Sequence, residues 1–184
     1  LEKILIILLT ILPLVWIILA AINDMLGPNP VQKSIFVSGW WALFFLQLTI
    51  TIPLIDRFFN TSFIKIRREL GLGTCLYSSI HLFIWLLIEN YQDFENIINE
   101  LILINYIFFG FIAYILLIPL TITSNNYLKA ILGNTWKKIH LLVYVILFLS
   151  IIHYVQSLKS IYEFNIILFL QLALIMIAIL IRLK

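Results

Sequence analysis

Long apolar runs are the feature of this sequence that most constrains its fold. The chain has 184 residues, of which 63% are hydrophobic and only 11% are charged, whereas a soluble domain is roughly 45–50% apolar and about 25% charged. We find six apolar runs, each close to the ~20 residues with which an α-helix crosses a ~30 Å hydrocarbon core. We therefore predict an all-α, polytopic membrane helix bundle of six transmembrane helices. The predicted spans cover about residues 5–21, 40–55, 72–88, 101–122, 139–155 and 165–180.

The segments between these runs are short. None is long enough to bury a hydrophobic core of its own, so we expect residues 1–184 to form a single transmembrane domain. No small-residue cleavage site follows the first run, which is therefore expected to be a retained span. Cys75 is the only cysteine, which excludes an internal disulfide and a cluster of thiolate ligands.

Basic residues gather in the loops on one side of the predicted bundle. The positive-inside rule places such loops in the cytoplasm, so both termini are predicted to be cytoplasmic and the acidic segment 89–100 to face outward. The net charge of +3 follows from this asymmetry and does not indicate a nucleic-acid partner. The basic residues of the two cytoplasmic loops are Arg57, Lys65, Arg67, Arg68, Lys129, Lys137 and Lys138.

All three histidines lie in or at the edge of predicted spans. An ionisable side chain within a membrane is costly, so each histidine marks a candidate functional site. His140 and His153 are 13 positions apart in one run, which at ~1.5 Å per residue separates them by roughly 20 Å, too far to ligate one metal ion. His81, from the third run, and His153 can reach one depth, and imidazoles from two helices supply the axial nitrogens that a haem iron needs. We therefore predict that His81 and His153 form the principal haem site of a membrane b-type cytochrome.

The other candidate site residues lie toward the predicted cytoplasmic side. His140 is a further candidate haem ligand, and the alternative is that it is an interfacial residue near the lipid headgroups. Arg67 and Arg68 occupy the positions of the third run where a partner histidine would be expected. A separation of 13 residues turns a helical side chain by roughly 140°, so His140 and His153 share a face only if their helix bends or contains a bulge. Arg67 and Arg68 are interpreted first as determinants of topology, and otherwise as partners of haem propionates or a flavin phosphate. The alternative for all the histidines is hydrogen bonding between helices.

Three stretches of the chain resemble one protein family. They are residues 38–43 (Ser-Gly-Trp-Trp-Ala-Leu), 67–72 (Arg-Arg-Glu-Leu-Gly-Leu) followed by Ile80-His81-Leu82, and 132–140 (Leu-Gly-Asn-Thr-Trp-Lys-Lys-Ile-His) followed by His153-Tyr154. The chain resembles the MsrQ family, the haem-binding membrane subunits of the bacterial periplasmic methionine sulfoxide reductase system. That family lies within the ferric reductase-like transmembrane superfamily, and the resemblance covers nearly the whole chain.

The resemblance implies a function and its cofactors. It implies haem b, and FMN is also attributed to the family. Electrons would come from the quinone pool or a cytosolic flavin reductase and cross the bacterial inner membrane. They would pass to a periplasmic molybdenum-containing methionine sulfoxide reductase, for the repair of oxidised periplasmic proteins. His81, His140 and His153 match the family's three haem-associated histidines, and the chain would be an electron-transfer subunit rather than the catalytic subunit.

Two other functions stay open. No G-x-G-x-x-G fingerprint for a dinucleotide occurs in the sequence, so we expect the chain to relay electrons and not to take hydride from a nicotinamide itself. A stand-alone ferric- or quinone-reducing membrane cytochrome would differ only in its acceptor. A cofactor-free membrane transporter or scaffold is an alternative of another class. A transporter of this size is expected to show internal repeats, and we find no convincing repeat in the sequence.

Overall fold

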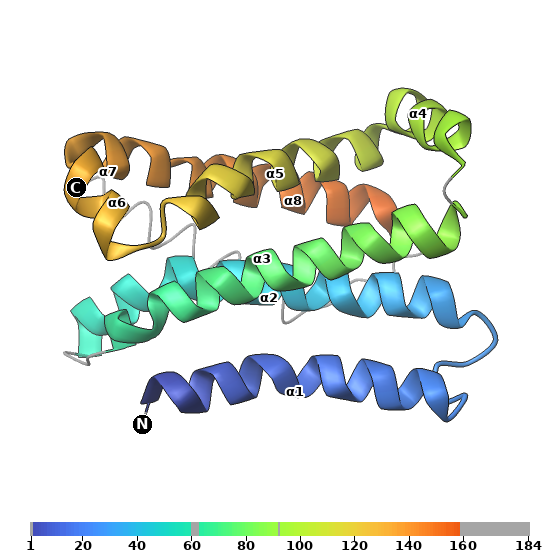
Figure 1. The fold of residues 1–184 in the computed structure, drawn as a ribbon, viewed down its shortest axis with the longest axis horizontal. Helices are drawn as coiled ribbons and strands as arrows, with labels where there is room; N and C mark the ends of the chain where they lie inside the picture. Colours follow the sequence, from blue (N-terminus) through green and yellow to red (C-terminus); the bar gives the residue numbers. More distant parts are fainter. Residues whose placement is uncertain (1, 60–62, 92, 159–184) are drawn as a thin grey trace.

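The computed structural model describes residues 2–59, 63–91 and 93–158, and each regular element within them is helical (Figure 1). The prediction of an all-α fold is confirmed. The elements are α1 (Glu2–Ile22), α2 (Pro30–Phe59), the 3₁₀ turn η1 (Phe63–Ile66), α3 (Arg67–Ile84), the π-helical turn η2 (Trp85–Glu89), α4 (Phe94–Leu103), α5 (Asn105–Ile122), α6 (Asn126–Leu132), α7 (Asn134–His140) and α8 (Leu142–Ser157).

Four helical segments among the described residues are long and apolar enough to cross a membrane, which makes the chain a multi-pass membrane protein. The apolar part of α1, Ile6–Ile22, is a shorter helix of the same character. The predicted sixth span, at about residues 165–180, lies outside the described residues. The four long segments are Pro30–Phe59, Phe63–Glu89, Asn105–Ile122 and Asn134–Ser157.

Helix α2 begins about ten residues before the predicted second span. Pro30 is its first residue, where a fixed φ and a missing N–H are tolerated. The hydroxyls of Ser34 and Ser38 donate to the carbonyls of Pro30 and Ser34, one turn earlier. Both hydroxyls are therefore hydrogen-bonded within the helix. The apolar run marks only the part of α2 that can lie in the hydrocarbon core of a membrane. The helix begins earlier, in the more polar residues that precede the run.

The predicted fourth span is two helices. Ile104 has φ −106° and ψ 99°, an extended conformation that ends α4 and precedes α5. Helix α4 also has its own N-cap, because the Asp93 carboxylate accepts hydrogen bonds from the backbone N–H groups of Glu95 and Asn96. Most of the segment predicted as an acidic loop is therefore helical.

The predicted loop before the fifth span also contains helices. Helices α6 and α7 meet at Gly133, whose φ of +50° suits glycine. The fifth span then runs through α7 and α8 with an interruption at Leu141. There the N–H groups of Leu141 and Tyr144 donate to carbonyls three residues back, at Lys138 and Leu141, instead of four.

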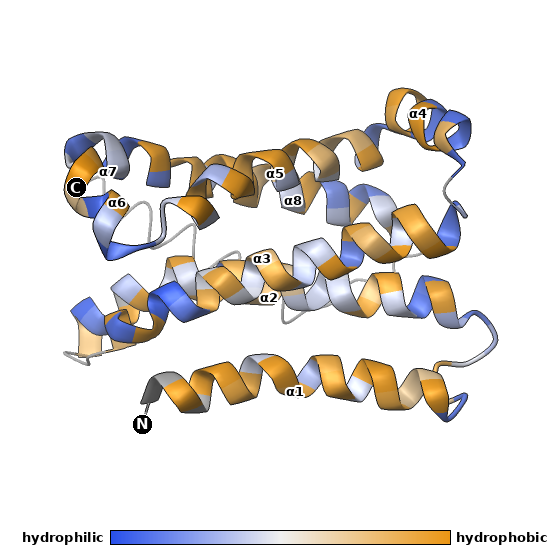
Figure 2. Cartoon of the chain, viewed as in Figure 1, coloured by the Kyte–Doolittle hydropathy of each residue, from blue (hydrophilic) through white to orange (hydrophobic). Residues whose placement is uncertain are grey.

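The two ends of the bundle differ in charge. The N-terminus, the end of α2, α6 and α7 lie at one end in Figure 1, and the α1–α2 connection and α4 lie at the other. Figure 2 shows hydrophilic residues concentrated at these ends and hydrophobic residues along the helices between them. The basic loop residues identified from the sequence all fall at the first end, which we call the basic end. The opposite end carries the acidic residues Glu89, Asp93, Glu95 and Glu100.

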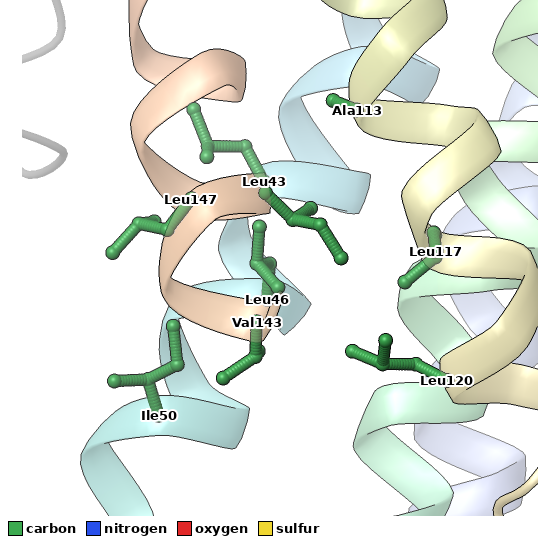
Figure 3. Packing of buried hydrophobic residues seen from close by; sticks show 9 residues of the cluster. Leu43, Leu46, Ile50, Ala113, Leu117, Leu120, Val143 and Leu147 are labelled. Carbon is green, nitrogen blue, oxygen red and sulfur yellow. The ribbon is translucent and has the colours of Figure 1, made fainter. Parts of the chain in front are cut away.

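Helices α2, α5 and α8 share one hydrophobic core, shown in Figure 3. Along all three helices these core residues lie between the basic end and the level of His81 and His153. The core therefore closes the basic side of the site described below. Its buried members are Leu43, Leu46, Ile50, Ala113, Leu117, Leu120, Val143, Ile146 and Leu147.

Candidate cofactor site

Two of the three histidines meet inside the bundle. The ring centroids of His81 on α3 and His153 on α8 are 5.8 Å apart, and the ring planes are at 90°. This is the pair that the depth argument from the sequence placed together. Their role as ligands stays a prediction.

The same kind of hydrogen bond holds both rings. His81 Nδ1 lies 2.8 Å from the carbonyl oxygen of Ile35 on α2, and His153 Nδ1 lies 2.7 Å from the carbonyl oxygen of Tyr106 on α5. A carbonyl oxygen only accepts, so each Nδ1 carries the proton and donates it. Each Nε2 is then left with a free lone pair, which is the tautomer that a metal-binding imidazole needs.

Both rings line one cavity of about 650 Å³. Pockets for cofactors and other small ligands span about 300–1,000 Å³. The walls come from α2, α3, α5 and α8 and include the aromatic side chains of Trp40 and Phe111. Lys33 and Glu100 line the cavity as well, and both lie toward the end of the bundle opposite the basic end.

The donor set fits a haem. His81 and His153 each offer an unprotonated Nε2 within one cavity, and their ring centroids are close enough that both imidazoles would hold one metal ion. The observed separation is 5.8 Å. An iron porphyrin brings four nitrogens of its own, and two imidazoles complete six-coordination.

His140 lies in a different setting at the basic end. Its ring stacks on Trp136 with centroids 4.0 Å apart, and its Nε2 is 3.1 Å from the hydroxyl of Thr123 on α5. The indole N–H of Trp136 donates to the carbonyl of Thr123 at 2.9 Å, and the Lys129 ammonium lies 5.1 Å from the Trp136 ring. The residues that line the cavity include His81 and His153 but not His140, within the ranges that the structure describes.

His140 and His153 nevertheless face the same neighbour. His140 bonds to Thr123 and His153 to Tyr106, and both of these residues belong to α5. The sequence allowed a common face only with a bend or bulge between the histidines. The interruption at Leu141 is such an irregularity.

The two arginines also lie at the basic end. Arg67 is the first residue of α3, and its Nε donates to the carbonyl of Thr49 on α2 at 3.0 Å. Arg68 follows it and is exposed. Neither residue is among those that line the cavity with His81, so the structure separates the arginines and His140 from the histidine pair.

Sequence reasoning missed a polar network at the opposite end. The Glu100 carboxylate accepts from Trp85 Nε1 at 3.1 Å and from Asn90 Nδ2 at 3.4 Å. Asn90 follows the π-helical turn, and its N–H donates to the carbonyl of Trp85, five residues back. The network ties the π-helical turn η2 and Asn90 to α4 beside the cavity. The sequence indicated only that the acidic segment 89–100 faces outward, which does not predict these contacts.

Comparison with known proteins gives a consistent set of relatives. The profile of the ferric reductase like transmembrane component matches residues 36–151, a range that contains His81 and His140 and ends two residues before His153. The chain is 33% identical over 148 residues to the protein-methionine-sulfoxide reductase heme-binding subunit MsrQ of Brucella anthropi, which is 80% of this chain and 67% of that protein. It is 36% identical over 146 residues to the protein of the same name from Herminiimonas arsenicoxydans, 78% of this chain and 67% of the relative. No solved structure matches.

Proposed function

The chain belongs to the ferric reductase-like transmembrane family, and from this premise we propose that it is a membrane b-type cytochrome, the haem-binding electron-transfer subunit of a methionine sulfoxide reductase system. The observation that carries the proposal is the pair of His81 and His153. Two imidazoles from different helices converge in one cavity, each with Nδ1 bonded to a backbone carbonyl and Nε2 free. The names of the relatives support the assignment to this system.

The chain's own groups would bind and orient the cofactor. When bound, haem provides a one-electron redox centre. His81 and His153 would hold the iron, while the carbonyls of Ile35 and Tyr106 keep the two rings in place and raise the basicity of Nε2. The core shared by α2, α5 and α8 excludes water from the basic side of the cavity. Covalent attachment of a c-type haem uses the motif C-x-x-C-H, which a sequence with Cys75 as its one cysteine does not contain.

The charge at the two ends suggests a direction for electron transfer. We place the basic end in the cytoplasm of a bacterial inner membrane by the positive-inside rule. The cavity then lies nearer the periplasm, where a molybdenum-containing methionine sulfoxide reductase would accept electrons. The quinone pool or a cytosolic flavin reductase would be the donor. Arg67, Arg68 and His140, at the basic end, are the residues that we propose for contact with FMN or with the donor.

A second candidate function differs from the proposed one only in the electron acceptor. The matching profile describes a ferric reductase-like component, so the chain acting alone on ferric iron or quinone is the alternative. The test is reoxidation of the chemically reduced protein, followed by its visible spectrum. Rapid reoxidation by the oxidised periplasmic reductase, and slow reoxidation by chelated ferric iron or a quinone analogue, is the expected result. The reverse order of rates would support the stand-alone reductase and contradict the proposed role.

A further inference from the structure

Both candidate ligand rings lie directly against a glycine of the neighbouring helix. A Cβ atom placed on Gly39 of α2 would be 2.9 Å from His81 Nδ1 and 3.0 Å from its Cε1. A Cβ atom on Gly110 of α5 would be 2.6 Å from His153 Nδ1 and 2.9 Å from its Cε1. Cβ atoms essentially never approach other heavy atoms within 3.0 Å. A side chain at either position would therefore force the ring or the helix to shift, and the shift would be larger at Gly110, where the approach is closer.

The carbonyl that accepts each ring's hydrogen bond lies one helical turn before the glycine. Ile35 precedes Gly39 by four residues, and Tyr106 precedes Gly110 by four residues. In an α-helix these carbonyls are also the acceptors for the glycines' own N–H groups. A carbonyl oxygen has two lone pairs and can serve both donors. The imidazole reaches this oxygen by lying over the next turn, where glycine presents only hydrogen.

Space, rather than backbone conformation, is what these positions require. The described glycines with positive φ are Gly27 and Gly133, so Gly39 and Gly110 have ordinary helical backbones. Glycine inside a helix is less favourable than alanine. At both positions, the close approach of an imidazole ring explains why a helix contains glycine in spite of this disadvantage. The arrangement occurs twice, once where α2 packs along α3 and once where α5 packs along α8.

We propose that Gly39 and Gly110 are positioning residues that set the planes of the two axial imidazoles. Each glycine lets the Nδ1 edge of a ring approach the adjacent helix and bond the carbonyl one turn away, which restricts the rotation of the ring about the axis through Nε2. Together the two contacts hold the ring planes perpendicular, at 90°. This inference rests on the proposed haem function, because it concerns the ligands of that haem. Ligand orientation is among the features that tune a haem centre.

Alanine variants test the role of each glycine. Gly71→Ala is the matched control, because Gly71 is also helical and its Cβ would meet only Thr49 Cγ2, at an ordinary 3.8 Å. All three variants add one methyl group and favour helix formation. We expect Gly110→Ala to retain haem roughly tenfold less tightly, the low end of the cost of disturbing a ligand's outer contacts. Gly39→Ala should change in the same direction by less, and Gly71→Ala should match the wild type.

The spectrum of the haem that remains separates positioning from a general structural effect. Perpendicular imidazole planes on a low-spin ferric haem give a strongly anisotropic EPR signal at low field, and near-parallel planes give a rhombic one. We expect the wild type and Gly71→Ala to show the low-field signal, and Gly39→Ala and Gly110→Ala to shift both this signal and the midpoint potential. A loss of helix content with an unchanged signal would mean a structural role only and would overturn the proposal.

Two further results would also overturn the proposal. One is wild-type haem content, EPR signal and potential in both Gly39→Ala and Gly110→Ala. The other is a rhombic signal from the wild-type protein, a measurement that does not depend on whether either variant folds. Wild-type protein that binds no haem would instead refute the proposed function, and this inference with it, so the two failures are distinguishable.

Discussion

Replacing the histidines one at a time should divide them into two classes. His153→Ala removes one of the two nitrogens proposed for the iron, together with the 2.7 Å hydrogen bond to Tyr106. His81→Ala does the same on the opposite side, where the bond to Ile35 is 2.8 Å. Because the two rings have equivalent contacts, the two variants should lose similar amounts of haem. His140 contacts Thr123 and Trp136 away from the cavity, so His140→Ala should retain the haem of the principal site.

The general cost of disturbing a metal ligand sets a lower limit on the expected loss of haem affinity. Disturbing only the outer contacts of a metal ligand costs about 10–100-fold in affinity. Removing His81 or His153 removes the ligand as well as its contact to a carbonyl, so haem affinity should fall by about 100-fold or more. That factor corresponds to about 2.8 kcal/mol. His140→Ala should instead slow reduction from the cytoplasmic side.

The assay is the ratio of haem to protein in the three alanine variants and the wild type, purified in parallel after expression with an adequate supply of haem. Haem is measured as its pyridine complex, and helix content is checked by circular dichroism. The reasoning is refuted if His140→Ala loses all its haem while His81→Ala keeps it. Equal losses in all three variants, with normal helix content, would also contradict the separation of His140 from the principal site.

Three further predictions concern topology and stability. A reporter inserted after Asn125 should be cytoplasmic and one inserted in α4 periplasmic, and the opposite result would reverse the proposed direction of electron flow. Tyr77→Phe removes a buried 2.7 Å hydrogen bond to the carbonyl of Thr10, so thermal unfolding should show a loss of about 1 kcal/mol with an unchanged haem spectrum. Glu100→Ala leaves the indole N–H of Trp85 without its acceptor and should cost about 1 kcal/mol or more, whereas Glu100→Gln should retain most of this stability; equal losses would argue against the hydrogen bond.

The sequence predicted those features that follow from helical rise and from apolar length. The long apolar runs indicated the helices, and counting residues along them placed His81 and His153 at one depth. Boundaries were predicted less well, because apolar length does not mark where a helix ends. Pro30 begins α2 in polar sequence, and the extended backbone of Ile104 divides a continuous apolar run into two helices.

The contacts that orient the histidine rings could not be predicted from the sequence. They depend on which helix packs on which, and on a backbone carbonyl that any residue supplies. Gly39 and Gly110 were the available signal, since a glycine within an apolar helix calls for a reason such as close packing. The repetition of the same contact in two helix pairs leaves no clear sequence repeat, because it requires only one glycine and one histidine in each pair.

The visible absorption spectrum of the purified protein shows directly whether it holds a haem with two imidazole ligands. If His81 and His153 ligate one haem, the dithionite-reduced protein should show an intense Soret band and the sharp, resolved bands of a six-coordinate, low-spin haem with two imidazole ligands. The same spectrum should not change when carbon monoxide is added, because no coordination position is open. Protein prepared with adequate haem that shows no Soret band, or one whose reduced haem is high-spin and binds carbon monoxide readily, would contradict the account.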